Sequence, residues 1–346
     1  MEYRALGTTG IEVSTFALGT ASFGDAVGPD RDVCVSMVRR ALDHGITMID
    51  AADSYGPGTA EEIVGTALRG RRQDVVVCTK VGLPTSGTPG GSGTSRRWIM
   101  ESVEGSLRRL GTEWIDVYMI HRPDPATDLE ETLGAMTDLV RSGKVRAVGC
   151  STFPAHQLVE AHWISQELGL EQLTVEQPPY SILVRHGERD VFEVTQRFGM
   201  GVVVWAPLAS GYLTGKYRGG AAPVGSRAAR LGRSADVATR FKYDVRAEHN
   251  APKHAAVDRL ATIAATAGIP LAQLAHAWVL HHPAVTSAII GPRLPEQLDD
   301  ALRGADLRLG ADVLDAIDEV VPPGTTVVDA DRSWVPPGLA REARRR

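Results

Sequence analysis

Short, continuously apolar runs alternate with helix-length segments along almost the whole chain, and this repeat constrains the fold most strongly. The runs predict strands at residues 16–19, 46–50, 75–80, 115–121, 145–150, 173–177, 202–205 and 285–290. The segments between them have helical spacing of apolar residues and several end at a glycine. They predict helices at 31–44, 61–69, 96–110, 129–142, 154–168, 190–198, within 253–281, and at 295–303. Strands that are apolar throughout are typical of parallel strands covered by helices.

Eight strand–helix repeats predict an α/β protein with the (β/α)8 architecture of a TIM barrel. The doubly wound sheet is the alternative, but no Gly-x-Gly-x-x-Gly turn follows the first strand. The 346 residues suit one barrel domain, which takes roughly 250 residues or more. We expect a single domain over 1–346, with a core at about 3–320 and a tail at 321–346 whose last residues are disordered.

Three segments do not fit the repeat. Residues 3–14 predict a small β-hairpin that caps the floor of the barrel. Residues 85–95 are rich in Gly, Ser, Thr and Pro and predict a loop. Residues 206–250 predict a long loop after the seventh strand, and loops of that length in compact domains are usually functional or disordered.

Composition narrows the functional classes. The net charge is −5 with both signs interspersed, and no basic stripe points to nucleic acid. No apolar run approaches the ~20 residues of a membrane span, and the chain begins without a recognisable secretion signal. Three widely spaced cysteines, Cys34, Cys78 and Cys150, offer neither a disulfide framework nor a metal pair. We therefore expect a cytoplasmic protein with reduced thiols, no metal site and no membrane partner.

Polar residues stand where consecutive apolar strands end. Asp50 ends the second strand, Lys80 the third and His121 the fourth, and Tyr55 lies five residues beyond Asp50. Singly, each has an ordinary explanation: a helix cap for Asp50, a loop charge for Lys80, a satisfied polar group for His121 and packing for Tyr55. Because α/β barrels carry their working residues at the carboxyl ends of strands, the set predicts one shared site.

The chemistry of a carbonyl reduction accounts for this set, because it requires a hydride on carbon and a proton on oxygen. A phenol of pKa about 10 is a weak acid, and the sequence predicts that the Lys80 ammonium lowers the pKa of Tyr55. Asp50 would hold Lys80 charged and oriented, and His121 would hydrogen-bond the substrate oxygen. The hydride must come from a nicotinamide, because side chains cannot supply one.

With these residues in view, the chain resembles the aldo-keto reductases, in the branch that includes the potassium-channel β subunits. The resemblance runs from Tyr3 to about Leu302, and its main motifs lie at 18–20, 45–56, 79–81, 115–124, 143–151, 177–181, 205–208 and 211–216. It implies four catalytic residues, and Asp50, Tyr55, Lys80 and His121 fill the matching positions.

The resemblance also implies NADPH as the cofactor. At the nicotinamide end, Trp205 resembles the stacking plate, and Ser151 and Gln177 resemble the partners of the carboxamide. The complete set of implied cofactor residues is Gly19, Thr20, Ala21, Asp50, Ser151, Thr152, Gln177, Trp205, Ala206, Pro207, Leu208, Ser210, Gly211, Lys216, Arg227, Gly291, Arg293, Gln297 and Asp300.

At the other end of the cofactor, residues 207–211 resemble the loop that wraps the pyrophosphate, with Lys216 and Arg227 toward the phosphates or the adenosine. Residues 291–293 and Gln297 would lie against the 2′-phosphate and adenine, and the planar guanidinium of Arg293 suits a phosphate. The sequence departs from the family pattern at Thr152, where many members have Asn. It departs again near the adenine, where Asp300 and Ala301 replace a common Glu and Asn.

For a reductase of this kind, we expect the substrate to be a small aldehyde, a ketone or a keto-sugar. The expected pocket residues are Phe23, Tyr55, Trp98, His121 and Trp334, on a rim formed by 21–29, 83–97, 123–128 and the tail; Trp98 and Trp334 have core packing as their alternative. Only five of the 37 lysines and arginines are lysine, which is typical of GC-rich bacteria. Family members there include reductases of nucleotide-linked deoxysugars, so a nucleotide-linked keto-sugar is one candidate.

Two other functions stay open. The first is an NADPH-binding regulatory subunit, as the channel β subunits exemplify. The second is a Schiff-base aldolase that uses Lys80. The sequence leaves the oligomeric state open between a monomer and a homo-oligomer.

Overall fold

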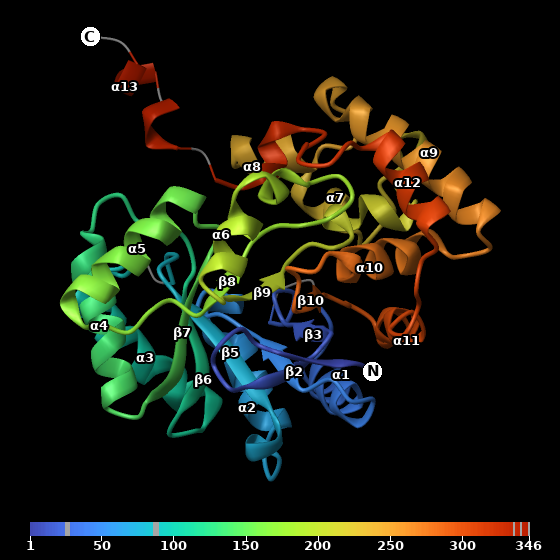
Figure 1. The fold of residues 1–346 in the computed structure, drawn as a ribbon. Helices are drawn as coiled ribbons and strands as arrows, with labels where there is room; N and C mark the ends of the chain where they lie inside the picture. The colour runs from blue at the N-terminus through green and yellow to red at the C-terminus, as the bar shows by residue number, and fades with distance from the viewer. Residues whose placement is uncertain (25–27, 86–89, 335, 340, 345–346) are drawn as a thin grey trace. The chain divides into compact units, whose positions relative to one another are not determined.

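Eight parallel strands close into a barrel in the computed structural model (Figure 1), and their order around the barrel is β10-β3-β4-β5-β6-β7-β8-β9. This confirms the predicted (β/α)8 barrel. The strands are β3 (Phe16–Gly19), β4 (Met48–Asp50), β5 (Val76–Val81), β6 (Ile115–Ile120), β7 (Val145–Ser151), β8 (Val175–Gln177), β9 (Gly201–Val204) and β10 (Ser287–Ile290).

The structure describes residues 1–24, 28–85, 90–334, 336–339 and 341–344. They divide into a first unit (1–178, 191–205 and 283–302) and a second unit (179–190, 206–282 and 303–346). The first unit holds the whole barrel. The single-domain interpretation stays a prediction, as does disorder at the chain end, where residues 345–346 lie outside the described residues.

Helices follow the strands of the first unit as the apolar spacing predicts. They are α1 (Arg31–Asp43), α2 (Thr59–Ala67), α3 (Arg96–Leu110), α4 (Leu129–Arg141), α5 (Ala155–Leu168), α6 (Val191–Arg197) and α11 (Pro295–Arg303), with short 3-10 turns at Gly56–Gly58 and Arg72–Asp74. Helix α3 illustrates the end signals: the Ser95 side chain caps its first turn, and Gly111 ends it in the left-handed conformation.

The predicted hairpin at the N-terminus is present. β1 (Tyr3–Ala5) pairs antiparallel with β2 (Glu12–Ser14), and the fully buried Leu6 and Val13 belong to the same core cluster as the barrel residue Val203. Gly7 has a φ of +58°, and a Cβ there would lie 2.3 Å from the backbone nitrogen of Gly201. Because Gly201 begins β9, the hairpin packs against the amino-terminal end of the barrel, as a floor cap should.

The second unit replaces the predicted structureless loop with short helices. They are the 3-10 turns Ala209–Thr214, Arg218–Gly220 and Glu248–Asn250 together with α7 (Arg227–Leu231) and α8 (Val237–Tyr243). The predicted helical region follows as α9 (Ala251–Thr266) and α10 (Leu271–His281). The sequence analysis missed α12 (Ala311–Val320), although Val313, Leu314 and Ile317 have helical spacing. The remaining elements are the turns His186–Arg189, Asp329–Arg332 and Pro337–Leu339, and α13 (Arg341–Arg344).

Within the described residues, no individual helix combines the length and apolar character needed to cross a membrane. One pair of helical segments, Glu248–Thr266 with Leu271–His281, passes that test only jointly and is bent by 94°.

Candidate active site

The alternation of side chains along each strand places a polar layer above an apolar one inside the barrel. Successive strand residues point to opposite faces, so a residue two positions after an inward one also points inward. Met48, Cys78 and Met119 belong to the apolar core cluster. Asp50, Lys80 and His121 follow them by two residues, and all three are at least 96% buried. The strand period therefore accounts for why these three polar groups share one end of the barrel.

Lys80 is the centre of the polar layer and is fully buried. Its Nζ donates to Asp50 Oδ1 at 2.6 Å and to the carbonyl oxygen of Ala51 at 2.8 Å, and it lies 3.5 Å from the hydroxyl of Tyr55. An ammonium has three N–H donors, so each has a partner here. Two partners hold the charge in place, and the third and longest contact is to the phenol.

Tyr55 and His121 complete the predicted set. Their rings meet edge to face with centroids 5.7 Å apart. The four predicted catalytic residues are therefore brought together by Lys80–Asp50, Lys80–Tyr55 and Tyr55–His121 contacts. The Nδ1 atom of His121 is buried and has no hydrogen-bond partner among the described residues. The imidazole of His121 can therefore still form a hydrogen bond with a ligand oxygen.

Burial of the phenol corrects one expectation. The sequence predicts that Lys80 lowers the pKa of Tyr55, whereas the pKa of Tyr55 is raised. Desolvation is the largest cause; the charge of Lys80 acts in the predicted direction but does not outweigh it, and Asp50 adds to the rise. Tyr55 therefore carries its proton throughout the neutral range.

Lys80 and His121 take opposite charge states. Burial opposes the charged form of Lys80, but the charges of Asp50 and Tyr55 raise the pKa of Lys80 on balance, so it stays an ammonium. Burial lowers the pKa of His121 well below its usual value, and the cations Lys80 and Arg122 lower it further. His121 is thus a neutral imidazole that can donate one hydrogen bond without carrying a charge.

Several predicted nicotinamide-end residues lie beside this group. Gln177 Nε2 donates to Asp50 Oδ1 at 2.7 Å, and Ser151 Oγ donates to the carbonyl oxygen of Gln177 at 2.8 Å. Thr152 has a φ of +61°, an uncommon conformation for a β-branched residue. The half-buried Trp205 follows β9, with the guanidinium carbon of Arg122 5.5 Å from its ring centroid.

The remaining predicted cofactor residues of the first unit lie at two neighbouring strand ends. Thr20 follows β3, and its Oγ1 donates to the carbonyl oxygen of Asp50 at 2.9 Å. Gly19 pairs with Asp50 in the sheet, and Ala21 is exposed. After β10, the backbone nitrogen of Arg293 donates to Gln297 Oε1 at 2.8 Å. Gly291 and Gln297 are exposed, and Asp300 is a half-buried residue of α11.

The other predicted cofactor residues belong to the second unit, and several of them lie in a loop with an unusual backbone conformation. Three residues in a row have positive φ: Ala209 at 46°, Ser210 at 59° and Gly211 at 99°. A Cβ on Gly211 would lie 3.0 Å from Lys216 Cε, so glycine leaves space beside a cation there. Strained backbone of this kind concentrates at ligand sites. Two of the three N–H groups are used within the loop, because Ala209 donates to the carbonyl oxygen of Ala206 at 2.8 Å and Gly211 donates to that of Leu208 at 2.9 Å.

Tyr217 ties that loop to the next element. Its hydroxyl donates to the carbonyl oxygen of Ser210 at 3.4 Å and accepts from the backbone nitrogen of Ala228 at 3.3 Å. The half-buried Arg227 begins α7 immediately before Ala228. The loop is preceded by Ala206, which has a φ of 58°, by the buried Pro207 and by the half-buried Leu208. Lys216 and Arg227 therefore belong to one connected group, and their contact with a cofactor stays a prediction.

Of the predicted substrate residues, the structure connects some to the catalytic loop. A Cβ on Gly56 would lie 3.0 Å from the carbonyl oxygen of Phe23, so the Phe23 segment adjoins the residue after Tyr55, although Phe23 itself is fully buried. Trp98 is half-buried and its Nε1 is buried without a partner among the described residues. Trp334 is half-buried in the second unit. Parts of the predicted rim, 25–27 and 86–89, lie outside the described residues.

Two buried acids and one arginine are features that the sequence analysis left unassigned. Burial raises the pKa of Asp53 to about 7 and that of Glu176 to about 8. Asp53 accepts a hydrogen bond from Ser102 at 2.8 Å. Glu176 accepts from the Cys150 thiol at 2.9 Å and from the backbone nitrogen of Phe153 at 3.2 Å. Arg122 lies inside the motif at 115–124, but its role is indicated only by its contacts in the structure.

Comparison with known proteins decides the family. Residues 15–322 match the model of the Aldo/keto reductase family. The chain belongs to the aldo/keto reductase family. Aldo/keto reductase relatives include a protein named "Probable voltage-gated potassium channel subunit beta" from Arabidopsis thaliana, 37% identical over 93% of this chain and 97% of its own length. The "Uncharacterized oxidoreductase YrpG" of Bacillus subtilis is 35% identical over 95% and 99%. The "Aldo-keto reductase YhdN" of the same species is 34% identical over 86% and 87%.

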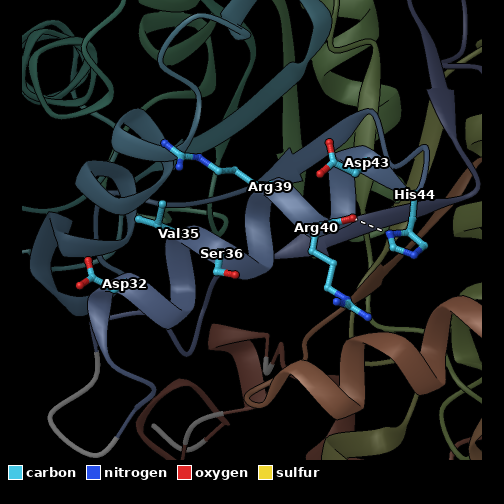
Figure 2. A pocket seen from close by; sticks show the side chains of 7 residues that line it. All are labelled: Asp32, Val35, Ser36, Arg39, Arg40, Asp43 and His44. Carbon is cyan, nitrogen blue, oxygen red and sulfur yellow. Dashed lines mark hydrogen bonds between the residues drawn. The ribbon is translucent and has the colours of Figure 1, made fainter.

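A hollow of about 530 Å³ on the outer face of α1 is separate from the candidate active site of this aldo/keto reductase (Figure 2). Two of its charged lining residues are already paired, Arg40 with Asp299 and Asp43 with Arg71, each at 2.6 Å. None of the four predicted catalytic residues lines it. The hollow is therefore an ordinary solvent-exposed surface of α1, and we assign it no role.

Proposed function

We propose that this chain is an NADPH-dependent carbonyl reductase in which Tyr55 gives a proton to the carbonyl oxygen of an aldehyde, a ketone or a keto-sugar. The observation that carries the proposal is the set of three contacts that the Lys80 ammonium makes. Its buried ammonium is held by Asp50 and Ala51 and directs its remaining contact at the Tyr55 hydroxyl. Such an arrangement serves a group that becomes negatively charged during the reaction.

Tyr55 suits the role of a general acid in the reductive direction. Its raised pKa keeps the proton on the phenol until the carbonyl oxygen gains negative charge and becomes far more basic. As the proton leaves, a phenolate forms 3.5 Å from the Lys80 ammonium, and a weak contact becomes an ion pair in a buried site. A positioned acid of this kind typically contributes ~10²–10⁴-fold to rate.

His121 positions the carbonyl in this proposal. A neutral imidazole can donate to the substrate oxygen without competing with Tyr55 as the acid. Its low pKa keeps that role unchanged down to acidic pH.

NADPH, when bound, supplies the hydride. Trp205, Ser151, Thr152 and Gln177 would hold its nicotinamide end, and the 207–211 loop with Lys216 would hold its phosphates. Arg227, Arg293 and Gln297 would bind the adenosine end. The cation of Arg293 favours NADPH over NADH, since a 2′-phosphate is present only in the former.

A cofactor titration followed by a carbonyl panel tests the proposal. Tryptophan emission should be quenched by NADPH at lower concentration than by NADH, and less so in Trp205→Phe. The panel should include an activated aldehyde such as 4-nitrobenzaldehyde. Tyr55→Phe should lose turnover by ~10³-fold or more with nearly unchanged NADPH affinity, because only the acid is removed. Wild-type protein that binds NADPH yet oxidises it with no carbonyl would refute the reductase activity.

A cofactor-binding regulatory subunit is a second candidate. It is favoured by two relatives that are 37% identical over nearly their full length and are named as probable channel β subunits. Co-purification with a membrane protein together with negligible turnover by the wild type would favour it. The Schiff-base aldolase gains no support, because that chemistry requires a neutral lysine and Lys80 is a paired ammonium.

A further inference from the structure

Arg122 contacts residues at two of the strand ends that are predicted to hold the nicotinamide, those of β7 and β9. One nitrogen, Nη1, lies 2.7 Å from the carbonyl oxygen of His121, 3.2 Å from Ser151 Oγ and 3.1 Å from Thr152 Oγ1, so its two N–H bonds are shared among three acceptors. The guanidinium carbon lies 5.5 Å from the ring centroid of Trp205. One side chain therefore contacts the backbone of His121, the hydroxyls of Ser151 and Thr152 and the ring of Trp205.

The chemistry of these contacts favours arginine over lysine. A planar guanidinium can donate along its edge while its face or carbon end lies against an aromatic ring. The contact with Thr152 is informative, because Thr152 has a positive φ of 61°. A hydroxyl held by Arg122 gives this strained residue a fixed orientation that the side chain alone would not provide.

We propose that Arg122 is a positioning residue for the nicotinamide end of the cofactor, which it organises by orienting Ser151 and Thr152 beneath the plate Trp205. This rests on the proposed function. It adds a residue to the proposed site, because the Arg122 guanidinium contacts the hydroxyls of both Ser151 and Thr152.

Arg122 also contributes a second buried cation to the site. The groups that face His121 are the Tyr55 ring, Lys80 from β5 and Arg122. Both cations lower the pKa of His121, and Arg122 likewise opposes the burial-driven rise of the pKa of Tyr55. Burial lowers the pKa of Arg122 itself, and its neighbours Tyr55 and Glu176 act in the opposite direction. Loss of the cation is therefore expected to make His121 easier to protonate.

Two variants separate the charge of Arg122 from its shape. Arg122→Met removes both, and Arg122→Lys keeps the charge but not the planar fork. We expect NADPH to bind at least ~10-fold more weakly to both variants, by quenching of tryptophan emission, because neither can hold both hydroxyls and the plate. In cofactor-free protein, the ¹³C-detected titration of His121 should move to higher pH in Arg122→Met and stay near the wild type in Arg122→Lys.

The control is Arg141→Met, since Arg141 is an exposed residue at the end of α4 that, among the described residues, donates to the backbone carbonyl of Gly169. It should leave NADPH affinity and the His121 titration unchanged. Thermal unfolding of each variant shows whether it is folded, and Arg122→Lys serves if Arg122→Met is not.

The outcomes distinguish this inference from the proposed function. Wild-type protein that fails to bind NADPH refutes the proposed function and the positioning role together. Normal NADPH binding by the wild type and by both Arg122 variants refutes the positioning role alone. Weakened binding in both variants, with the His121 titration moved only in Arg122→Met, supports it.

Discussion

The two layers inside the barrel are built by the same strands and obey different rules. Met48, Cys78 and Met119 form part of a layer of apolar side chains, and Asp50, Lys80 and His121 lie two residues further along those strands. Both layers are almost completely buried. In the apolar layer, removal from water is favourable in itself. In the polar layer it is costly, so each charged or polar group requires a specific partner.

This contrast explains why the polar layer is confined to one end of the barrel. A buried ammonium and carboxylate are tolerated only when their geometry is good and further hydrogen bonds satisfy them. Asp50 Oδ1 accepts from both Lys80 and Gln177, and Lys80 has a partner for each donor. The apolar layer and the hairpin below it can then supply the packing on which this arrangement depends.

Lys80→Met should have the largest effect, because it breaks the polar layer by stranding a buried carboxylate. Loss of one member of a buried ion pair typically costs about 3–5 kcal/mol, and turnover should fall ~10³-fold. Urea unfolding and kcat/KM measure the two effects. The double variant Asp50→Asn with Lys80→Met should regain stability without regaining turnover. If the single variant is as stable as the wild type, the pair is not buried as described.

Met48→Ala should lower the stability of the protein but leave its turnover nearly unchanged. The change leaves a cavity in the apolar layer, and Met→Ala in a core typically costs about 2–5 kcal/mol. The four predicted catalytic residues keep their partners, so kcat of the folded protein should stay within about threefold of the wild type. A loss of kcat as large as that of Tyr55→Phe would show that the two layers are not separable.

Much of this organisation could be predicted from the sequence, because it depends on short-range regularities. Strand period and the position of strand ends led to Asp50, Lys80 and His121, and a glycine end signal indicated where α3 ends. The sign of the pKa shift of Tyr55 could not be predicted. It is the difference between desolvation and several charges, and desolvation depends on packing from distant segments.

The residues that were missed share a cause. Arg122, Asp53 and Glu176 act through contacts with side chains that are 30, 49 and 26 residues away in sequence. No local pattern distinguishes a buried arginine or acid of this kind from a solvated one. The helices in 206–250 were missed because Gly and Pro there favour loops, and tertiary packing overrides such local preferences.

Asp53 extends the comparison to pH. Its pKa in the folded state is about 7, against about 4 in an unfolded chain. Between those values the folded protein binds a proton that the unfolded chain has released, so the free energy of unfolding falls as pH rises from 4 to 7. Above pH 7, Asp53 is ionised in the folded and in the unfolded protein, so its contribution to the free energy of unfolding no longer changes with pH. Asp53→Asn should remove a slope of about 1.4 kcal/mol per pH unit within that window.

The measurement is the difference between wild-type and Asp53→Asn unfolding free energies at several pH values. The difference isolates Asp53 from other groups that titrate nearby, including Glu176, whose pKa of about 8 gives the same sign over a higher range. Asparagine can still accept from Ser102. A difference that does not change between pH 4.5 and 7 would mean that Asp53 is ionised in the folded protein throughout.

Arg71→Met should have the smallest effect, and it tests the comparison most directly. Arg71 and Asp43 are 2.6 Å apart, the same distance as Lys80 and Asp50. However, the side chains of the first pair are 37% and 63% exposed, and those of the second are 0% and 4% exposed. Water already solvates the Asp43 carboxylate, so loss of its partner should cost at most about 1 kcal/mol by urea unfolding. If Arg71→Met cost as much as Lys80→Met, the contact distance rather than burial would set the strength of these pairs. The distinction between a costly polar layer and a tolerant surface would then fail.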